Sequence, residues 1–124
     1  MHLSFASLLQ VLESEKYAMY RSHLASVKGV YCLTDQSCGK LYVGSAYGVE
    51  GVAQRWNCYL DTRTGNNKRL VLLYKKRGKK YFEENFTFTL LEFFDKKCPT
   101  EKIIARENYW KKALDTCKHG YNEK

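Results

Sequence analysis

Two tyrosines and an arginine are the side chains whose types and spacing first suggest chemistry in this chain. Tyr31 lies in residues 30–33 and Tyr42 in residues 40–43, two segments of strand-type composition on either side of a turn-forming segment. Arg55 follows after a connection that contains two glycines. An arginine fork matches phosphate oxygens, so the three side chains could form a site if the fold brings them together.

Strand alternation indicates which side chains of this hairpin share a face. Val30 and Cys32 fall on one face of the first strand, and Leu41 and Val43 on one face of the second. If these apolar sets face the core, the two tyrosines emerge together on the opposite face. Leu33 also falls on the tyrosine side, so the alternation is imperfect.

A helix is predicted at residues 52–61, because apolar residues recur there every four positions. Arg55 and Tyr59, also four apart, flank that apolar stripe. Two interpretations stay open at this point. The arginine either covers Trp56 with its aliphatic stem or points at the tyrosines of the hairpin.

Glu107 is the most unusual acidic residue, because it falls in the middle of an apolar helix face. In the last predicted helix, Ile103, Trp110 and Leu114 recur at helical spacing around it. An inward carboxylate is costly unless a basic side chain or a cation pairs with it. Glu107 is therefore either part of an internal ion pair, with Arg55 or a lysine, or a metal ligand.

The remaining segments must position these groups. Residues 3–26 have helical patterns in two pieces, which we expect to cover one side or edge of the sheet. Residues 86–90 alternate strictly and predict the third strand of a three-stranded sheet. Residues 68–77 predict a further helix, which Gly78 would end. Pro99 is expected at the first position of the last helix.

Composition favours a single domain with a polyanionic partner. The 124 residues include 21 Lys and Arg against 13 Asp and Glu, a net charge of +8, which favours nucleic acid first and a membrane surface second. The basic residues concentrate between positions 68 and 80. The candidate phosphate-contacting residues in that stretch are Lys68, Arg69, Lys75 and Lys76. Such charges carry no information on base sequence.

Neither a membrane span nor a disulfide framework is predicted. No apolar segment approaches the ~20 residues that a spanning helix needs, and the N-terminal segment lacks the features of a signal peptide. The five cysteines are odd in number and contain no C-x-x-C pair. We therefore expect reduced thiols and a cytoplasmic protein.

Six sequence elements in a fixed order resemble the GIY-YIG nuclease superfamily. They are Gly29-Val30-Tyr31, Tyr42-Val43-Gly44, Arg55-Trp56, the Phe86-Thr87-Phe88 strand, Ala105-Arg106-Glu107 with Tyr109-Trp110, and Tyr121-Asn122. The resemblance covers roughly residues 28–122. It implies an α+β fold in which a three-stranded antiparallel sheet is flanked by helices. It divides the chain into an N-terminal helical extension, residues 1–27, and a nuclease domain, residues 28–124.

The resemblance also implies Mg²⁺- or Mn²⁺-dependent cleavage of a DNA phosphodiester. By that resemblance Tyr31 and Tyr42 would line the site, one of them helping to activate the attacking water. Arg55 would stabilise charge on the phosphorus, and Glu107 would hold a single metal ion. Asn122 matches the asparagine that many members carry near the end of the domain, which supports the site.

The chain departs from the commonest pattern of the superfamily at one position. Many members carry histidine four residues after the arginine, where this chain has Tyr59. Some members resemble this chain because they also have tyrosine at that position. The group that accepts the proton of water is thus left open. Members also often place histidine near the turn at residues 65–67, and this chain has none.

Two further interpretations follow from these features. A non-catalytic nucleic-acid-binding module on the same scaffold is the alternative to an endonuclease, and the charge and Tyr59 support it. Members usually gain specificity from additional DNA-binding domains. We expect this chain to be either a fragment of a longer protein that carries such domains or a stand-alone nuclease with weak sequence preference. The sequence predicts no oligomeric state.

Overall fold

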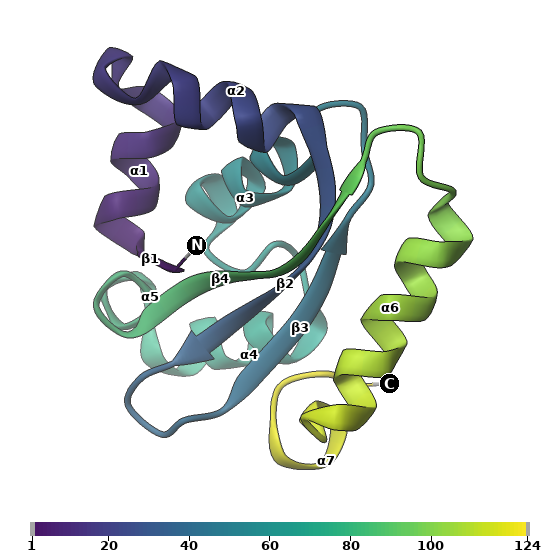
Figure 1. Ribbon diagram of the computed structural model, residues 1–124. Helices are drawn as coiled ribbons and strands as arrows, with labels where there is room; N and C mark the ends of the chain where they lie inside the picture. Colours follow the sequence, from purple (N-terminus) through teal and green to yellow (C-terminus); the bar gives the residue numbers. More distant parts are fainter. Residues whose placement is uncertain (1, 124) are drawn as a thin grey trace.

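A four-stranded antiparallel sheet is the frame of the computed structural model, which describes residues 2–123 (Figure 1). The strands are β1 (His2–Ser4), β2 (Val27–Asp35), β3 (Leu41–Ala46) and β4 (Phe86–Asp95). The helices are α1 (Phe5–Glu13), α2 (Ala18–Ser26), α3 (Gly51–Thr62), α4 (Lys68–Arg77), α5 (Lys79–Asn85), α6 (Thr100–Ala113) and α7 (Thr116–His119), with a 3₁₀ turn at Glu15–Tyr17.

The strand order is β1-β4-β2-β3, so the expected number of three strands is wrong. The hairpin of β2 and β3 and the long strand β4 are confirmed, and β4 pairs with β2. The additional strand β1 pairs with residues 87–89 on the outer edge of β4. Three residues are too few to show alternation. This strand exists because the edge of β4 offers unpaired backbone groups.

Helices cover both faces of the sheet, and each face has its own core. On one face, α1 to α5 enclose a large core that includes Tyr31, Leu33, Trp56 and Phe88. On the other face α6 packs over a small core of Val30, Cys32, Val43 and Ile103. The predicted assignment of hairpin faces is confirmed. The tyrosine face is buried as well, which explains why Leu33 points that way.

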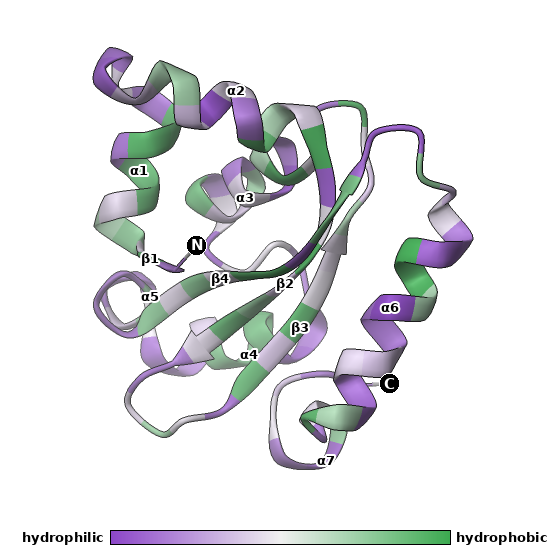
Figure 2. Ribbon diagram, viewed as in Figure 1, coloured by the Kyte–Doolittle hydropathy of each residue, from purple (hydrophilic) through white to green (hydrophobic). Residues whose placement is uncertain are grey.

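Hydrophobic residues are distributed differently over the strands and the helices. Figure 2 shows hydrophobic residues along β2 and β4, whereas α3 and α6 mix hydrophobic and hydrophilic ones. The bounds predicted for α4 are confirmed at both ends, and α3 differs by one residue at each end. Pro99 is the N-cap of α6, one residue before its first turn, so its expected position inside the helix is wrong.

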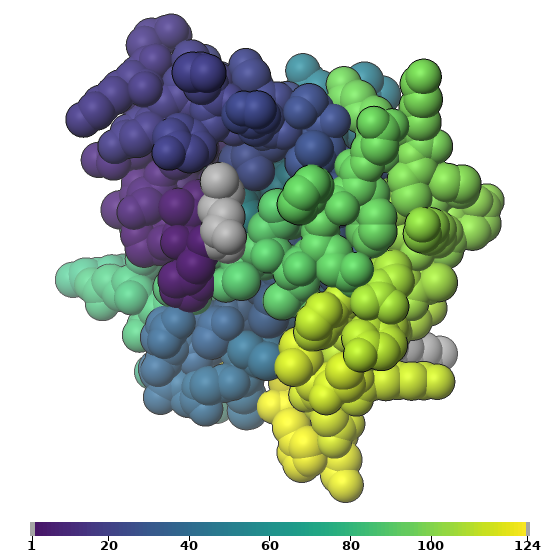
Figure 3. Space-filling view, in the orientation of Figure 1, coloured from purple at the N-terminus to yellow at the C-terminus, as the bar shows by residue number. Residues whose placement is uncertain are grey.

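The N-terminal segment is built into the sheet and the larger core. Its residues Phe5, Leu8 and Val11 are buried there, and α1 contacts α2, α3 and α5. In the space-filling view, this segment and the C-terminal segment lie on opposite sides of the visible face (Figure 3). No helix formed by residues 2–123 is both long and apolar enough to cross a membrane. The five cysteines are free thiols, as expected.

Asp35 fastens the far end of the hairpin to two later segments. Its buried carboxylate accepts hydrogen bonds from the hydroxyls of Tyr81 and Tyr121, at 2.6 and 2.7 Å, and from Ser37. Burial alone would raise the pKa of Asp35, but these hydrogen bonds outweigh it and hold the pKa below its ordinary value. The carboxylate thus ties α5 and the segment after α7 to the hairpin.

Candidate active site

A cavity of about 500 Å³ opens at the β3 edge of the sheet, and it brings four of the predicted site residues together. Tyr31, Tyr42, Arg55 and Glu107 all line it. Its other lining residues are Gly44, Ser45, Ala46, Tyr47, Gly48, Gly51, Gln54 and Cys58. The predicted residues Tyr59 and Asn122 are buried outside this lining. Residues from β2, β3, α3 and α6 therefore meet in one place.

Gly44 allows Tyr31 to reach this cavity. The two residues are direct partners in the β2–β3 ladder, and the phenol ring of Tyr31 passes over Gly44. A Cβ atom at position 44 would lie 2.5 Å from the Tyr31 hydroxyl and 2.6 Å from its Cζ atom. Only glycine leaves room for the ring, which gives Tyr42-Val43-Gly44 a steric explanation.

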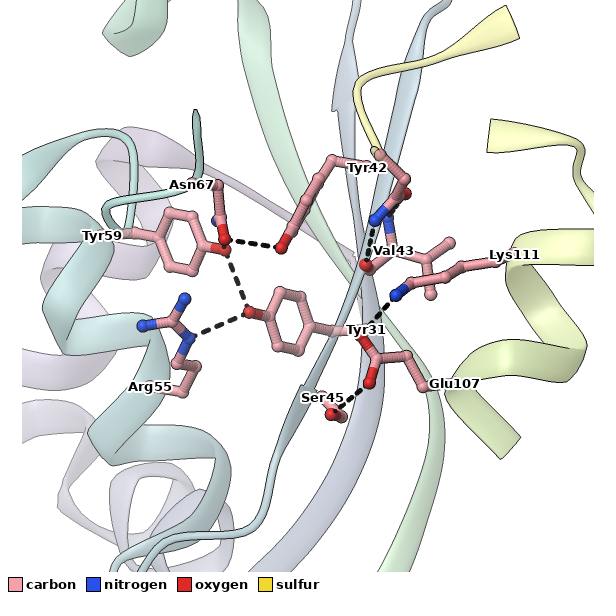
Figure 4. A network of polar contacts seen from close by, with 10 residues as sticks. Tyr31, Tyr42, Val43, Ser45, Arg55, Tyr59, Asn67, Glu107 and Lys111 are labelled. Carbon is pink, nitrogen blue, oxygen red and sulfur yellow. Dashed lines mark hydrogen bonds and ion pairs between the residues drawn. The ribbon is translucent and has the colours of Figure 1, made fainter. Parts of the chain in front are cut away.

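A chain of hydrogen bonds links the arginine and three phenols through one amide (Figure 4). Arg55 Nε donates to the Tyr31 hydroxyl at 3.2 Å, and that hydroxyl lies 3.0 Å from the hydroxyl of Tyr59. Asn67 Nδ2 donates to Tyr59 at 2.8 Å, while Tyr42 donates to Asn67 Oδ1 at 2.6 Å. Each phenol in the chain is thereby fixed in position.

Of the two interpretations of Arg55, the one that points it at the tyrosines is confirmed. Besides its bond to Tyr31, its Nη2 donates to the carbonyl of Gly65 at 3.0 Å. The guanidinium lies over the ring of Tyr59, 5.1 Å from its centroid. A third hydrogen bond runs from Nη1 to the Cys58 sulfur at 3.7 Å. Three hydrogen bonds and an aromatic face hold the arginine, so its charge stays beside the cavity.

Burial raises the pKa of all three phenols, which is already well above neutral pH for an ordinary tyrosine. Desolvation raises the pKa of Tyr31, and the charge of Arg55 offsets only part of that rise. Burial likewise raises the pKa of Tyr42, with Tyr31 and Glu107 adding to it. The pKa of Tyr59 is raised well above its ordinary value, again by burial first. None of the three is a ready-made base, and each is available as a hydrogen-bond donor or acceptor.

Glu107 approaches the cavity from the opposite face of the sheet, from α6. Its Oε1 accepts a hydrogen bond from the Ser45 hydroxyl at 2.8 Å, and Lys111 Nζ lies 3.4 Å from its Oε2 (Figure 4). The expected internal ion pair of Glu107 with Arg55 or a lysine is therefore present, and its partner is Lys111 of the same helix. Leu114 is 37% exposed, so the apolar face around Glu107 ends before the C-cap.

The residues around Glu107 fit a hydrated magnesium or manganese ion. Mg²⁺ typically binds one or two carboxylates, keeps several waters and uses substrate phosphates as further ligands. Glu107 is the one carboxylate that lines the cavity, and residues 2–123 contain no cluster of three or more His, Cys, Asp or Glu side chains. A site for an ion held by a single carboxylate, with the Ser45 hydroxyl beside it, is what this donor set can provide.

Asn122 acts on the backbone of β3. Its side chain accepts a hydrogen bond from the Val43 amide at 2.8 Å and donates to the Val43 carbonyl at 2.9 Å, as a neighbouring strand would. The amide of Tyr121 extends this pairing to the Leu41 carbonyl at 2.8 Å. Asn122 therefore fixes the strand segment between Tyr42 and Gly44, and we expect it to support the site indirectly.

The four predicted phosphate-contacting residues all lie on α4 but differ in availability. Lys75 and Lys76 are exposed. Lys68 is exposed, with Glu123 3.8 Å from its ammonium group. Arg69 donates to the carbonyls of Cys117 and Gly120, at 3.0 and 3.2 Å, so its guanidinium mainly holds the C-terminal segment.

Sequence reasoning missed three residues of the site. Asn67 connects two phenols from the turn at residues 65–67. Ser45 shares a strand face with Val43, so alternation places it on the α6 side. Lys111 lies one helical turn after Glu107, the spacing at which opposite charges pair. Alternation and helical spacing could therefore have found the last two.

Comparison with known proteins gives consistent results. The family model described as the GIY-YIG catalytic domain matches residues 27–122. Two solved structures are similar to this chain. The first is a mutant of the catalytic domain of intron endonuclease I-TevI, with 28% identity over 79% of this chain and 94% of that chain and a TM-score of 0.59. The second is the catalytic domain of homing endonuclease I-TevI, with 29% identity over 77% of this chain and 96% of that chain and a TM-score of 0.56. No curated protein sequence is significantly similar to the chain.

Proposed function

The chain belongs to the GIY-YIG family of nuclease domains, and from this premise we propose that it is a metal-dependent DNA endonuclease that hydrolyses phosphodiester bonds. One observation carries the proposal. Tyr31, Tyr42, Arg55 and Glu107 come from four different elements and line the same cavity. A guanidinium can neutralise charge on phosphate oxygens, a lone carboxylate can hold one metal ion, and the phenols can position a water, which together suit phosphodiester hydrolysis.

Arg55 is the phosphate-binding group in this proposal. Hydrolysis places additional negative charge on the oxygens around the phosphorus, and a guanidinium offers a fork of N–H donors that matches two of them. Arg55 uses Nε, one Nη1 donor and one Nη2 donor to hold its position, and its remaining N–H donors are left for a substrate. Its fixed position means that little conformational entropy is lost when a phosphate binds.

Glu107 and Ser45 form the metal-binding side of the site. A Mg²⁺ or Mn²⁺ ion would supply positive charge for the leaving 3′-oxygen and lower the pKa of nearby phenols. The hydrogen bond from Ser45 orients one carboxylate oxygen of Glu107. Such orientation of a ligand by a neighbouring group strengthens metal binding.

Tyr31 and Tyr42 would position the attacking water. Their pKa values are raised, so each phenol keeps its proton until a cation binds nearby. Tyr59 and Asn67 hold the two hydroxyls in place from behind. We propose that Tyr59, in place of the usual histidine, has this positioning role, and that one of the two cavity phenols accepts the proton of water.

Plasmid nicking tests the proposal. Supercoiled DNA is incubated with the protein and Mg²⁺ or Mn²⁺, and the wild type is compared with Glu107→Gln. Glu101→Gln is the matched control, since Glu101 is exposed on the same helix. We expect metal-dependent nicking that Glu107→Gln abolishes and Glu101→Gln preserves. Equal nicking by wild type and Glu107→Gln, or none by the wild type, would refute a metal-dependent nuclease.

A non-catalytic nucleic-acid-binding module is the second candidate. The net charge of +8 favours it, and so does the raised pKa of Tyr59, which makes this phenol a poor proton acceptor. It predicts DNA binding that weakens with salt, is unaffected by Glu107→Gln and occurs without cleavage. Additional DNA-binding domains and a cytoplasmic location stay predictions; the free thiols support the latter.

A further inference from the structure

A second, smaller cavity lies on the other side of Tyr42. It measures about 170 Å³, and Tyr42 lines both cavities. Lys68, Arg69 and Lys111 line it together with a single acidic residue, Glu123. This cavity is therefore positively charged and shares a wall with the proposed cleavage site.

Two of its three cations are available to bind an anion. Arg69 is already bonded to two backbone carbonyls. The contact of Lys68 with Glu123 is 3.8 Å long and lies at the surface, where such pairs contribute little. The side chain of Lys111 is only 18% exposed, so an anion bound there would be less screened by water.

Lys111 is also the charge that links the two cavities. Its ammonium lies 3.4 Å from Glu107, longer than the roughly 2.7–2.9 Å of a strong charge-assisted hydrogen bond. Ser45 holds the other carboxylate oxygen, so Glu107 keeps a partner if Lys111 turns away. Lys111 can therefore exchange this contact for a phosphate in the second cavity while the carboxylate keeps its hydrogen bond from Ser45.

We propose that the second cavity binds a backbone phosphate of the same DNA strand, adjacent to the phosphate held beside Arg55, with Lys111 and Lys68 as its ligands. The proposal rests on the proposed nuclease function. A nucleic-acid strand presents phosphates in succession, and two cavities that share Tyr42 provide neighbouring places for two of them. Tyr42 would then lie between two consecutive phosphates.

DNA binding in EDTA tests this subsite independently of catalysis. Fluorescence anisotropy measures the affinity for a labelled duplex at several salt concentrations, for wild type, Lys111→Gln, Lys68→Gln and Lys111→Arg. Lys112→Gln is the matched control, because Lys112 is the next residue of α6, is exposed and lines neither cavity. Urea unfolding checks that every variant folds.

We expect Lys111→Gln and Lys68→Gln each to weaken binding roughly three- to tenfold more than Lys112→Gln does. The slope of log affinity against log salt should decrease by about 0.9 for each lost contact. Lys111→Arg keeps the charge and should retain most of the affinity. If Lys111→Gln and Lys112→Gln bind DNA with the same affinity and the same salt slope as the wild type, the proposed phosphate subsite is wrong.

Two further outcomes have separate meanings. If inorganic phosphate stabilises the wild type against urea but not Lys111→Gln, while DNA affinity is the same in both, the cavity takes a free anion and the proposal is wrong. If the wild type nicks plasmid in a Glu107-dependent way but Lys111 does not affect binding, only the subsite fails. A wild type that neither binds nor nicks DNA removes the nuclease function and the subsite together.

Discussion

Replacing Gly44 by alanine should disturb the stability and the site of this protein together. The new Cβ atom would lie 2.5 Å from the Tyr31 hydroxyl and 2.6 Å from its Cζ atom, well inside van der Waals contact. Tyr31 is 1% exposed and packs edge-on against the rings of Trp56 and Tyr59, so it has little room to move. Overpacking of this kind typically costs about 1–3 kcal/mol of unfolding free energy.

The clash can also be relieved by rotation of the Tyr31 ring, at the expense of its position in the site. Rotation would break the hydrogen bonds to Arg55 and Tyr59. A displacement of about 1 Å at a reacting group can lower the rate on the order of 100-fold. Gly44→Ala should therefore shift the urea midpoint downward, lower the nicking rate or do both.

Urea unfolding and plasmid nicking measure these two effects. Gly48→Ala is the control for stability, because a Cβ there would meet only the flexible end of Gln54. In a Tyr31→Leu background most of the stability cost of Gly44→Ala should disappear, since the ring is gone. If Gly44→Ala unfolds at the wild-type midpoint and nicks at the wild-type rate, the steric explanation of Gly44 is refuted.

Three further variants test the network around the cavity. Asn122→Ala should lower the unfolding free energy by about 1–3 kcal/mol in urea titrations, because it leaves the backbone N–H and C=O of Val43 without their side-chain partners. A loss of unfolding free energy near zero would contradict the strand-like role of Asn122. Tyr59→Phe should reduce the rate constant of nicking at saturating DNA and leave DNA affinity in EDTA unchanged, since the hydroxyl bonds to Tyr31 and Asn67 and Tyr59 does not line the cavity. Weaker binding with an unchanged rate would exclude this role. Tyr121→Phe removes a hydrogen bond to the Asp35 carboxylate and should destabilise the protein at pH 7 but not in acid. The folded-state pKa of Asp35 is lowered, so the stability that its carboxylate contributes is lost as the pH falls through that pKa, below the ordinary carboxyl value of about 3.9. A difference in urea unfolding that does not change with pH would exclude this linkage.

The elements with a strong local pattern could be predicted from the sequence. Residues 68–77 form a helix with the predicted bounds, because helical spacing and Gly78 both mark it. The hairpin faces were also correct, since alternation is a property of strand geometry and requires no tertiary information. Within the site, the convergence of Tyr31, Tyr42, Arg55 and Glu107 could be anticipated from the family resemblance.

The features that escaped prediction depend on contacts between distant segments. Strand β1 exists through backbone pairing with the edge of β4, which leaves no trace in its three residues. Helix α5, residues 79–85, was not anticipated, because Gly78 hides the continuation of the helical pattern after α4. The role of Asn67 follows from the distance between two hydroxyls, and no spacing rule specifies it.

The partition of the site between the two faces of the sheet has a consequence for the growing chain on the ribosome. Arg55 and the hairpin are synthesised about 50 residues before Glu107, a delay of roughly 3–10 s at typical rates of elongation. The carboxylate reaches the cavity only after α6 packs on the sheet, and Asn122 then fixes β3. For the proposed nuclease, the basic helix α4 would therefore be synthesised before the metal-binding carboxylate is in place, which separates binding from cleavage in time.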